Sequence, residues 1–200
     1  MREGTLTLKG TLTARKLSGK APLSWKIRNS LRWNYIRGWL GHKATKGFSR
    51  LTGVAVLMPE LRAVHIRNGH RTDYGIVSRL SVTTAFVNFL CTNLQTDSTE
   101  FGDFKYHDSG VGITGEAIGN TAMETTDGES RATGSQVAST NTYTSVGTIA
   151  YTTTKAITEH GVFSSAASTT LMDRSVFSAI NVVSGDSIEF TYVLTASAGG

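Results

Sequence analysis

The most regular alternation of apolar and polar residues lies near the C-terminus. From Ile188 to Thr195 every second residue is apolar, which is the period of a β-strand with one buried face. Shorter segments of the same type cover residues 143–151, 157–163 and 176–182, and Ser184-Gly185-Asp186 is a typical turn. Several short strands separated by Gly, Ser and Asp turns predict a mainly β protein, built as an antiparallel β-sandwich or a jelly-roll-like module.

One segment has the period of a helix instead. Apolar side chains recur three or four residues apart, and Thr83 or Ser81 is a suitable N-cap. We predict one packed helix over about residues 83–94, with its aromatic stripe lying on a sheet. Such a stripe is more typical of core packing than of a cofactor site, and no cofactor is predicted. Its members are Val82, Phe86, Phe89, Leu90 and Leu94.

The first 70 residues give a less regular pattern. Residues 4–9 are nearly repeated as residues 10–15, and leucine alternates with threonine, which predicts a strand or a hairpin. Residues 24–40 have a helical period with interleaved arginines, which predicts a short basic amphipathic helix ending near Gly41. Residues 54–57 predict a strand that ends at Pro59, and residues 61–66 have no clear assignment.

The composition is that of a folded chain with room for a core, because 39% of the 200 residues are hydrophobic. Cys91 is the sole cysteine, so an internal disulfide and a zinc site of several cysteines are excluded. No apolar run is long enough to span a membrane, and no signal-peptide pattern follows Met1. We expect a soluble protein that stays in the cell or leaves it by lysis, without a membrane partner.

The charges are unevenly distributed along the chain. Residues 1–80 contain 16 of the 20 Lys and Arg residues and three acids, a net charge of +13. Residues 81–200 contain four basic and 12 acidic residues, a net charge of −8. Such a split indicates an interaction surface for nucleic acid, a membrane or an acidic partner, and it permits attraction between copies of the chain. A solvated basic face without a partner is the alternative.

The basic segment around residues 25–50 also contains all three tryptophans. Arg and Trp commonly anchor protein interfaces, and the same residues can bind phosphates and stack on bases. We favour an acidic protein surface as the partner, with nucleic acid and simple core packing of the tryptophans as alternatives. The candidate partner-binding residues are Trp25, Arg28, Arg32, Trp33, Arg37, Trp39, Lys43 and Lys46.

These patterns divide the chain into two regions. We predict a basic N-terminal arm or docking region over residues 1–71 and a β-sandwich domain over residues 72–200. Residues 81–200 are expected to fold as the compact unit, whereas residues 1–50 are expected to become ordered mainly against a partner. Weakly hydrophobic, Ser/Thr-rich sheets often complete their burial in oligomers, so a homo-oligomer is expected.

No residues of the chain are predicted to be catalytic, cofactor-binding or metal-binding. Residues 107–109 read His-Asp-Ser, but neighbouring side chains of a strand point to opposite faces. Residues 159–160 read Glu-His and lack further ligands at metal-site spacing. The glycines between residues 110 and 119 are not followed by a phosphate-loop signature and predict a mobile, turn-rich loop. Three histidines among basic residues suit a phosphate or carboxylate better than a metal: His42, His65 and His70.

Several short motifs resemble those of a known group of proteins. Residues 72–200 resemble an uncharacterised group of tailed-bacteriophage virion structural proteins, and they are similar to modules of phage tail-fibre, collar and decoration proteins. The motifs are residues 103–110 (DFKYHDSG), 131–134 (RATG), 156–163 (AITEHGVF), 171–177 (LMDRSVF) and 184–188 (SGDSI).

The resemblance implies a non-enzymatic virion protein that is assembled in the host cytoplasm. Together with the charge split, it favours a capsid decoration or cement protein that docks on capsid or other virion proteins through its basic N-terminal region. A tail, collar or fibre-attachment component is the alternative within this class. A nucleic-acid-binding module that contacts packaged genome is an alternative of another class, and a glycan-degrading virion hydrolase is a third.

One structural pair is predicted within these motifs. Glu159 and Arg174 carry opposite charges on two segments that are expected to form adjacent strands. A cross-strand ion pair would fix the register where the strand faces are weakly hydrophobic. If exposed, it would contribute only about 0–1 kcal/mol to stability.

Overall fold

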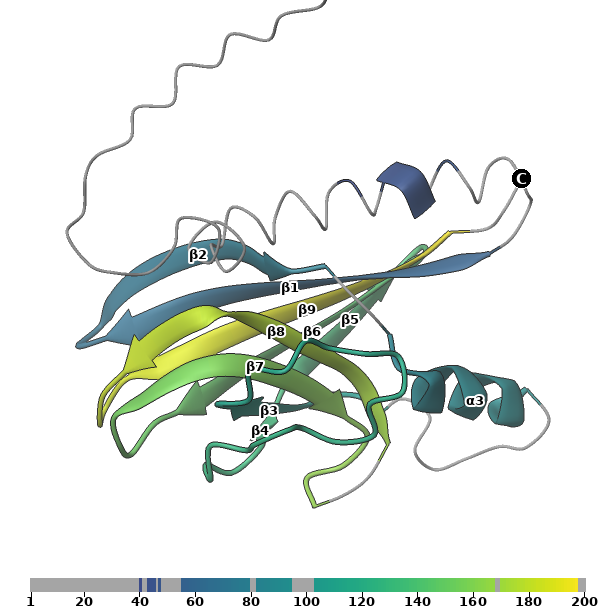
Figure 1. Cartoon of the computed structure of the whole chain (residues 1–200). Helices are drawn as coiled ribbons and strands as arrows, with labels where there is room; N and C mark the ends of the chain where they lie inside the picture. Colours follow the sequence, from purple (N-terminus) through teal and green to yellow (C-terminus); the bar gives the residue numbers. More distant parts are fainter. Residues whose placement is uncertain are drawn as a thin grey trace, which may run out of the picture.

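The computed structural model describes residues 40, 43–45, 47, 55–79, 82–94, 103–167 and 170–197. In this part of the chain, two antiparallel sheets pack face to face (Figure 1), which confirms the predicted β-sandwich. The five-stranded sheet has the order β2-β1-β9-β6-β5 and the four-stranded sheet the order β4-β3-β7-β8. The elements are β1 (Val56–Arg67), β2 (His70–Ser78), α3 (Thr84–Asn93), β3 (Tyr106–Gly110), β4 (Ala132–Thr133), β5 (Ser135–Ser139), β6 (Thr142–Ala150), β7 (Lys155–Phe163), β8 (Leu171–Val182) and β9 (Ser187–Ser197).

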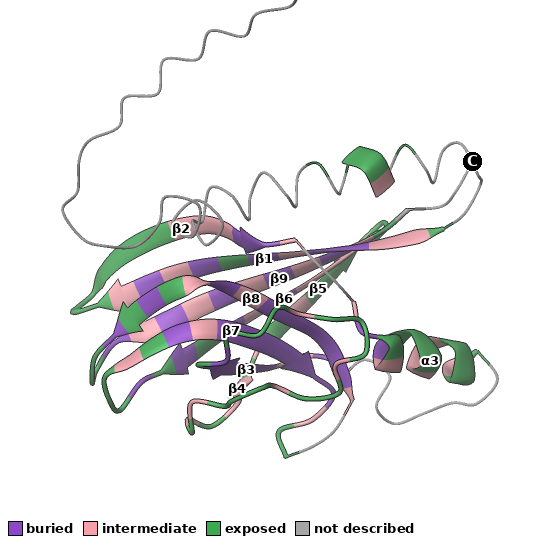
Figure 2. Ribbon diagram, viewed as in Figure 1, coloured by how far each residue is buried: buried purple, intermediate pink, exposed green. Residues whose placement is uncertain are grey.

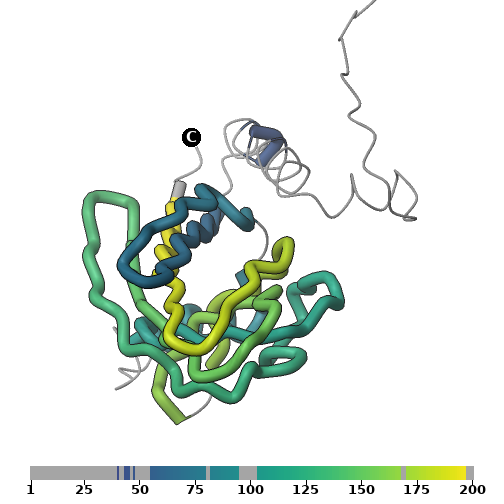
Figure 3. The backbone as a smooth tube through the Cα atoms, turned by 90° about the vertical axis from the view of Figure 1, so that its left-hand side faces the viewer, coloured from purple at the N-terminus to yellow at the C-terminus, as the bar shows by residue number. Residues whose placement is uncertain are grey.

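The core lies between the two sheets, where the buried residues of both layers gather (Figure 2). Figure 3 shows the backbone of the same two layers turned by 90°. Strand β9 is central in its sheet, and its inward residues follow the predicted alternation, with Ile188, Phe190 and Tyr192 fully buried. Ile157 and Ile180 belong to the opposing sheet and to the same core cluster. Burying a large apolar side chain of this kind stabilises the fold by about 1.5–3 kcal/mol.

Strand β1 corrects the expected domain boundary. It pairs with β9 at every position from Val56 to Ile66, and it buries Leu61 and Ala63 in the core. Strand β2 begins at His70 and forms the edge of the same sheet. The sandwich therefore includes residues 56–71, which we had assigned to the N-terminal arm. Strand β1 lies between β2 and β9, so the sheet is incomplete without it.

Pro59 does not end this strand, contrary to the prediction. It lies opposite Leu194 of β9, whereas the described pairing of β1 with β2 begins at Leu61. Proline lacks a backbone N–H and is tolerated where a strand has a neighbour on one side only. The strand therefore continues through Pro59 to Arg67 and includes the segment that had no assignment.

Helix α3 confirms the predicted helix over residues 83–94. Thr83 is the N-cap, and its Oγ1 accepts a hydrogen bond from the backbone N–H of Phe86 at 3.2 Å. The helix lies at one end of the sandwich (Figure 1). There the rings of Phe86 and Phe89 pack edge-on against Phe104, at centroid distances of 4.9 and 5.0 Å. Phe86 and Phe89 are thus part of the packing, as their spacing indicated, whereas Leu94, the last member of the predicted stripe, is 90% exposed.

The other N-terminal predictions lie mostly outside the described residues, including the strand or hairpin over residues 4–15. Leu40, residues 43–45 and Gly47 are helical. Helical residues thus occur beyond Gly41, where we expected the basic helix to end. Among the residues that the structure describes, no helix has the length and apolar character needed to cross a membrane.

Candidate functional site

The structure describes one of the predicted partner-binding residues. Lys43 lies in the helical residues 43–45 and is exposed. The remaining candidates lie outside the described residues: Trp25, Arg28, Arg32, Trp33, Arg37, Trp39 and Lys46. Their assignment to a partner surface stays a prediction.

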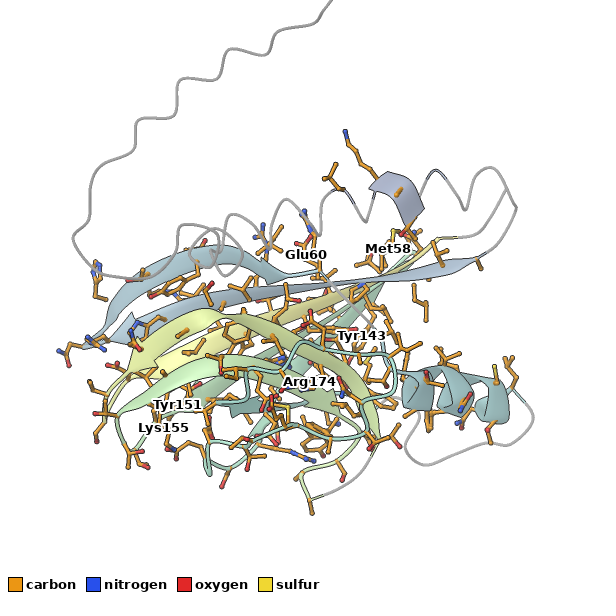
Figure 4. The ribbon with its side chains drawn as sticks, viewed as in Figure 1. Met58, Glu60, Tyr143, Tyr151, Lys155 and Arg174 are labelled. Carbon is orange, nitrogen blue, oxygen red and sulfur yellow. The ribbon has the colours of Figure 1, made fainter. Side chains whose placement is uncertain are left out.

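The predicted pair of Glu159 and Arg174 is present and is buried. Arg174 Nε donates to Glu159 Oε2 at 2.7 Å, from strand β8 to strand β7, and the two side chains are 2% and 0% exposed. Figure 4 labels Arg174 at the centre of the molecule. We had considered the weak contribution of an exposed pair. A buried pair differs, because removing one partner leaves an uncompensated charge and costs about 3–5 kcal/mol.

The segment between β3 and β4 folds back over this ion pair. Both oxygens of Glu159 accept backbone N–H groups from it: Oε1 from Gly112 at 3.2 Å and from Thr125 at 2.8 Å, and Oε2 from Glu124 at 3.2 Å. Arg174 donates to Thr114 O and to a carboxylate oxygen of Glu124, at 3.2 and 3.1 Å. We call residues 111–126 the anchored loop. Its turns were predicted, but it is held to the sheet at several points, which we had not expected.

Two of the glycines in this region allow the backbone to approach the carboxylate of Glu159 closely. A Cβ on Gly110 would lie 2.6 Å from Glu159 Oε1, and a Cβ on Gly112 would lie 2.5 Å from the same atom. Contacts under 3.0 Å are too short for a side chain at either position. The glycines between residues 110 and 119 therefore serve, at these two positions, to bring the backbone onto a buried carboxylate.

The His-Asp-Ser sequence of strand β3 is divided between the two faces of its sheet, as the period of a strand predicts. His107 contacts Ser145 of the opposing sheet at 2.8 Å, and Ser109 lies 3.1 Å from the hydroxyl of Tyr151. Asp108 points the other way and binds Arg131 Nε at 3.0 Å. These three residues do not converge on one reacting atom.

His107 and His160 form a buried polar chain between the sheets. Nδ1 of His107 lies 2.9 Å from Nε2 of His160, and its Nε2 lies 2.8 Å from Ser145 Oγ. Burial lowers the pKa of His107 to about 4 and that of His160 well below its ordinary value, so both rings are neutral near pH 7. Within the described residues His160 Nδ1 has no partner. Because both rings are neutral, one ring donates to the other across the 2.9 Å contact.

Asp173 is a second buried titratable group. Its carboxyl is 0% exposed, and Ser175 Oγ donates to Oδ1 at 2.7 Å, whereas Oδ2 has no partner among the described residues. Burial raises the pKa of Asp173 to about 7. The sequence does not distinguish this aspartate from surface acids, because its burial depends on contacts with distant segments, such as the bridge from Val82 and the pairing with Val162.

The arginines of β1 and β2, and Arg79 directly after β2, are paired within the sandwich. Arg62 and Arg79 both bind Glu60, whose position is labelled in Figure 4. Arg71 binds Glu189. Arg67 and His65 both bind the buried Asp186, at 2.7 and 2.9 Å, and the hydrogen bonds from Arg67 hold the pKa of this carboxyl well below its usual range. His65 thus contacts a carboxylate, as predicted.

The described residues contain no group of three His, Cys, Asp or Glu side chains that is arranged to hold a metal ion. They do contain two polar pockets beside the anchored loop. One is lined by Asp108, Thr126, Glu129, Ser130, Arg131, Ala166 and Ala167. The other is lined by Thr114, Gly119, Asn120, Thr121, Ala122, Met123, Glu124 and Arg174. Sequence reasoning did not identify these pockets, because each brings together segments that are far apart in the chain.

No protein-family model, curated protein or solved structure matches this chain.

Proposed function

We propose that this chain is a non-enzymatic structural protein of a bacteriophage virion, and that it decorates or cements the capsid. In this proposal the β-sandwich forms the body, and the basic N-terminal segment docks on acidic surfaces of capsid subunits. The observation that carries the proposal is the separation of charge between this segment and the sandwich. The resemblance of residues 72–200 to phage structural proteins supports the choice of virion.

The charge distribution supports docking through the segment that precedes β1. Residues 1–55 contain 12 basic residues and one acid, a net charge of +11, whereas residues 56–200 have a net charge of −6. The arginines of β1 and β2, and Arg79 directly after β2, are paired with acids of the sandwich, so they add little positive charge to its surface. The positive charge that can attract a partner is thus concentrated before β1, and it acts over about 8–10 Å at physiological salt.

The location in the particle is tested by copy number. Purified virions should contain this chain, and a cement protein requires hundreds of copies, whereas a tail, collar or fibre-attachment component requires few. Quantitative proteomics of purified particles, followed by cryo-electron microscopy, measures this number. Absence from virions overturns the proposal. A low copy number contradicts a cement role and favours a tail, collar or fibre-attachment component.

The docking mode is tested by reversing charge in the basic segment. The triple variant R28E/R32E/R37E should lose attachment to particles that lack the protein, with an unchanged circular dichroism spectrum. The matched control is R28K/R32K/R37K, which keeps the charge and should still attach. Attachment that survives charge reversal contradicts docking through this segment.

A nucleic-acid-binding module is the second candidate, and it is favoured by the three tryptophans among the basic residues of the same segment. Binding to phosphates releases counterions, so the logarithm of its affinity falls linearly with the logarithm of salt concentration. Filter binding to DNA and RNA over a salt series measures this slope. Tight, salt-dependent binding to nucleic acid without attachment to emptied capsids would favour this candidate over cement.

A further inference from the structure

The pocket that contains Asp108 and Arg131 lies on the outer face of the four-stranded sheet and has a volume of about 380 Å³. This volume is within the range of small-molecule sites, about 300–1,000 Å³. Its lining comes from β3, from residues 126–131 and from the connection between β7 and β8. The docking function proposed above does not require such a pocket.

The charged groups of this pocket are held in place before any ligand arrives. Arg131 donates to Asp108 and to Ser165 O at 3.0 and 2.9 Å, and its guanidinium carbon lies 3.5 Å from the centre of the Phe163 ring. Glu129 accepts from Lys155 Nζ and from the backbone N–H of Thr152, at 2.9 and 3.0 Å. Figure 4 labels Lys155, the first residue of β7. Fixed polar groups reduce the ordering cost of binding.

The remaining lining residues are small, and two of them have hydroxyl groups that can still form hydrogen bonds. Thr126 and Ser130 are exposed, and their hydroxyls make no side-chain hydrogen bond within the described part of the chain. A hydroxyl both donates and accepts. Ala166 and Ala167 add two exposed methyl groups at the rim. The pocket thus presents donors, acceptors and a small apolar surface.

The charge balance narrows the class of ligand. Asp108 and Glu129 are balanced by Arg131 and Lys155, so the charged groups at the pocket have no net charge and do not attract an anion such as phosphate. Each of the two carboxylates already has a cationic partner, Arg131 or Lys155, which disfavours a metal ion. A neutral ligand with many hydroxyl groups satisfies both donors and acceptors. A peptide side chain would need a deeper apolar pocket than two alanines provide.

We propose that this pocket binds a neutral saccharide unit. The sugar hydroxyls bond to Asp108, Glu129, Arg131, Thr126 and Ser130, and the C–H face of the ring lies against the alanine methyl groups. In a virion protein, such a site would hold the particle to hydroxyl-rich cell-surface glycans. The site is a property of the sandwich and does not depend on how the N-terminal segment docks.

The purified full chain tests this directly. Saturation-transfer NMR with the methyl glycosides of glucose, galactose, mannose and N-acetylglucosamine, followed by an array of neutral and anionic oligosaccharides, should identify at least one neutral ligand. The variant A166W fills the rim of the pocket and should weaken binding at least tenfold. The variant T126V removes one hydroxyl at constant shape and should weaken binding about five- to tenfold.

The matched control is A122W, because Ala122 is an exposed rim alanine of the second polar pocket. It should bind as the parent does, and circular dichroism should show all variants folded. Four outcomes overturn the proposal: no neutral saccharide binds the folded parent, anionic glycans alone bind, binding survives A166W, or A122W abolishes it equally. None of these outcomes affects the docking proposal, which is measured on particles.

Discussion

Replacing Glu159 with glutamine tests whether this buried carboxylate anchors the loop over residues 111–126. The substitution keeps the shape of the side chain but removes its charge. It also replaces one acceptor oxygen by an NH₂ group, which is a donor. Because the carboxylate is fully buried, water cannot compensate for what is lost.

The size of the effect follows from the four hydrogen bonds. Oε1 accepts from two backbone N–H groups of the loop, and Oε2 accepts from one more and from Arg174 Nε. In either orientation the NH₂ group of glutamine faces two donors, so two hydrogen bonds are lost. At about 1.5–3 kcal/mol for each hydrogen bond to a charged group, the free energy of unfolding should fall by about 3–6 kcal/mol. This is a large part of the total stability of a domain, about 5–15 kcal/mol.

Urea unfolding at pH 7, followed by circular dichroism, measures this difference. The matched control is E189Q, which removes an equal charge from the exposed pair of Glu189 with Arg71 and should cost about 0–1 kcal/mol. A variant E159Q that fails to fold while E189Q folds also agrees with the prediction. A cost for E159Q below about 1 kcal/mol, equal to that of the control, would refute the anchoring role.

Three further predictions concern the buried groups and the extent of the domain. Burial raises the pKa of Asp173 from 3.8 to about 7, so its stabilising contribution is complete below about pH 3.8 and is lost as the pH rises through 7. The free energy of unfolding of D173N, measured with urea at pH 8, should therefore be higher than that of the parent by up to about 4 kcal/mol. An advantage that does not shrink toward pH 4 would contradict this. Burial lowers the pKa of His107 from 6.5 to about 4, so this ring alone should lower the free energy of unfolding by up to about 3 kcal/mol as the pH drops from 6.5 to 4, and protonation of the buried His160 adds to that loss. In the parent, protonation of Asp173 stabilises the fold over the same pH range and opposes this loss. The free energy of unfolding should therefore fall more steeply with acid in D173N than in the parent, and equal slopes in the two proteins would contradict the prediction. A fragment of residues 72–200 lacks β1 and should be unfolded by circular dichroism, whereas residues 54–200 should fold; a folded 72–200 fragment would restore the original boundary.

Local sequence patterns were sufficient to predict strand β9, the start of helix α3 and one ion pair. Strand β9 has sheet neighbours on both sides and one face in the core, so its alternation is uninterrupted and its burial could be predicted residue by residue. The N-cap Thr83 acts on a backbone group three residues away, and so the start of α3 was also readable from the sequence. The Glu159–Arg174 pair followed from opposite charges on strands that the pattern had already placed.

Register and neighbours were decided by the tertiary structure alone. A register shift in the pairing of β7 with β8 lies between Ile157 and Glu159. Ile157 faces the core, whereas Glu159 faces the anchored loop, although simple alternation would put both on one face. Strand β1 passes through Pro59 because its neighbour on one side begins only at Leu61. Neither feature depends on the local sequence.

The candidate sites show the same division. The charge of the basic segment and its tryptophans are sequence properties, and they suggested a docking function before any fold was known. The pocket around Asp108 requires residues 108, 126–131 and 166–167 to meet, and the pKa of Asp173 requires complete burial. Both result from contacts between segments far apart in the chain. A single sequence carries no signal for such contacts, because pairing between distant strands depends on the whole sheet rather than on the residues that each strand contains.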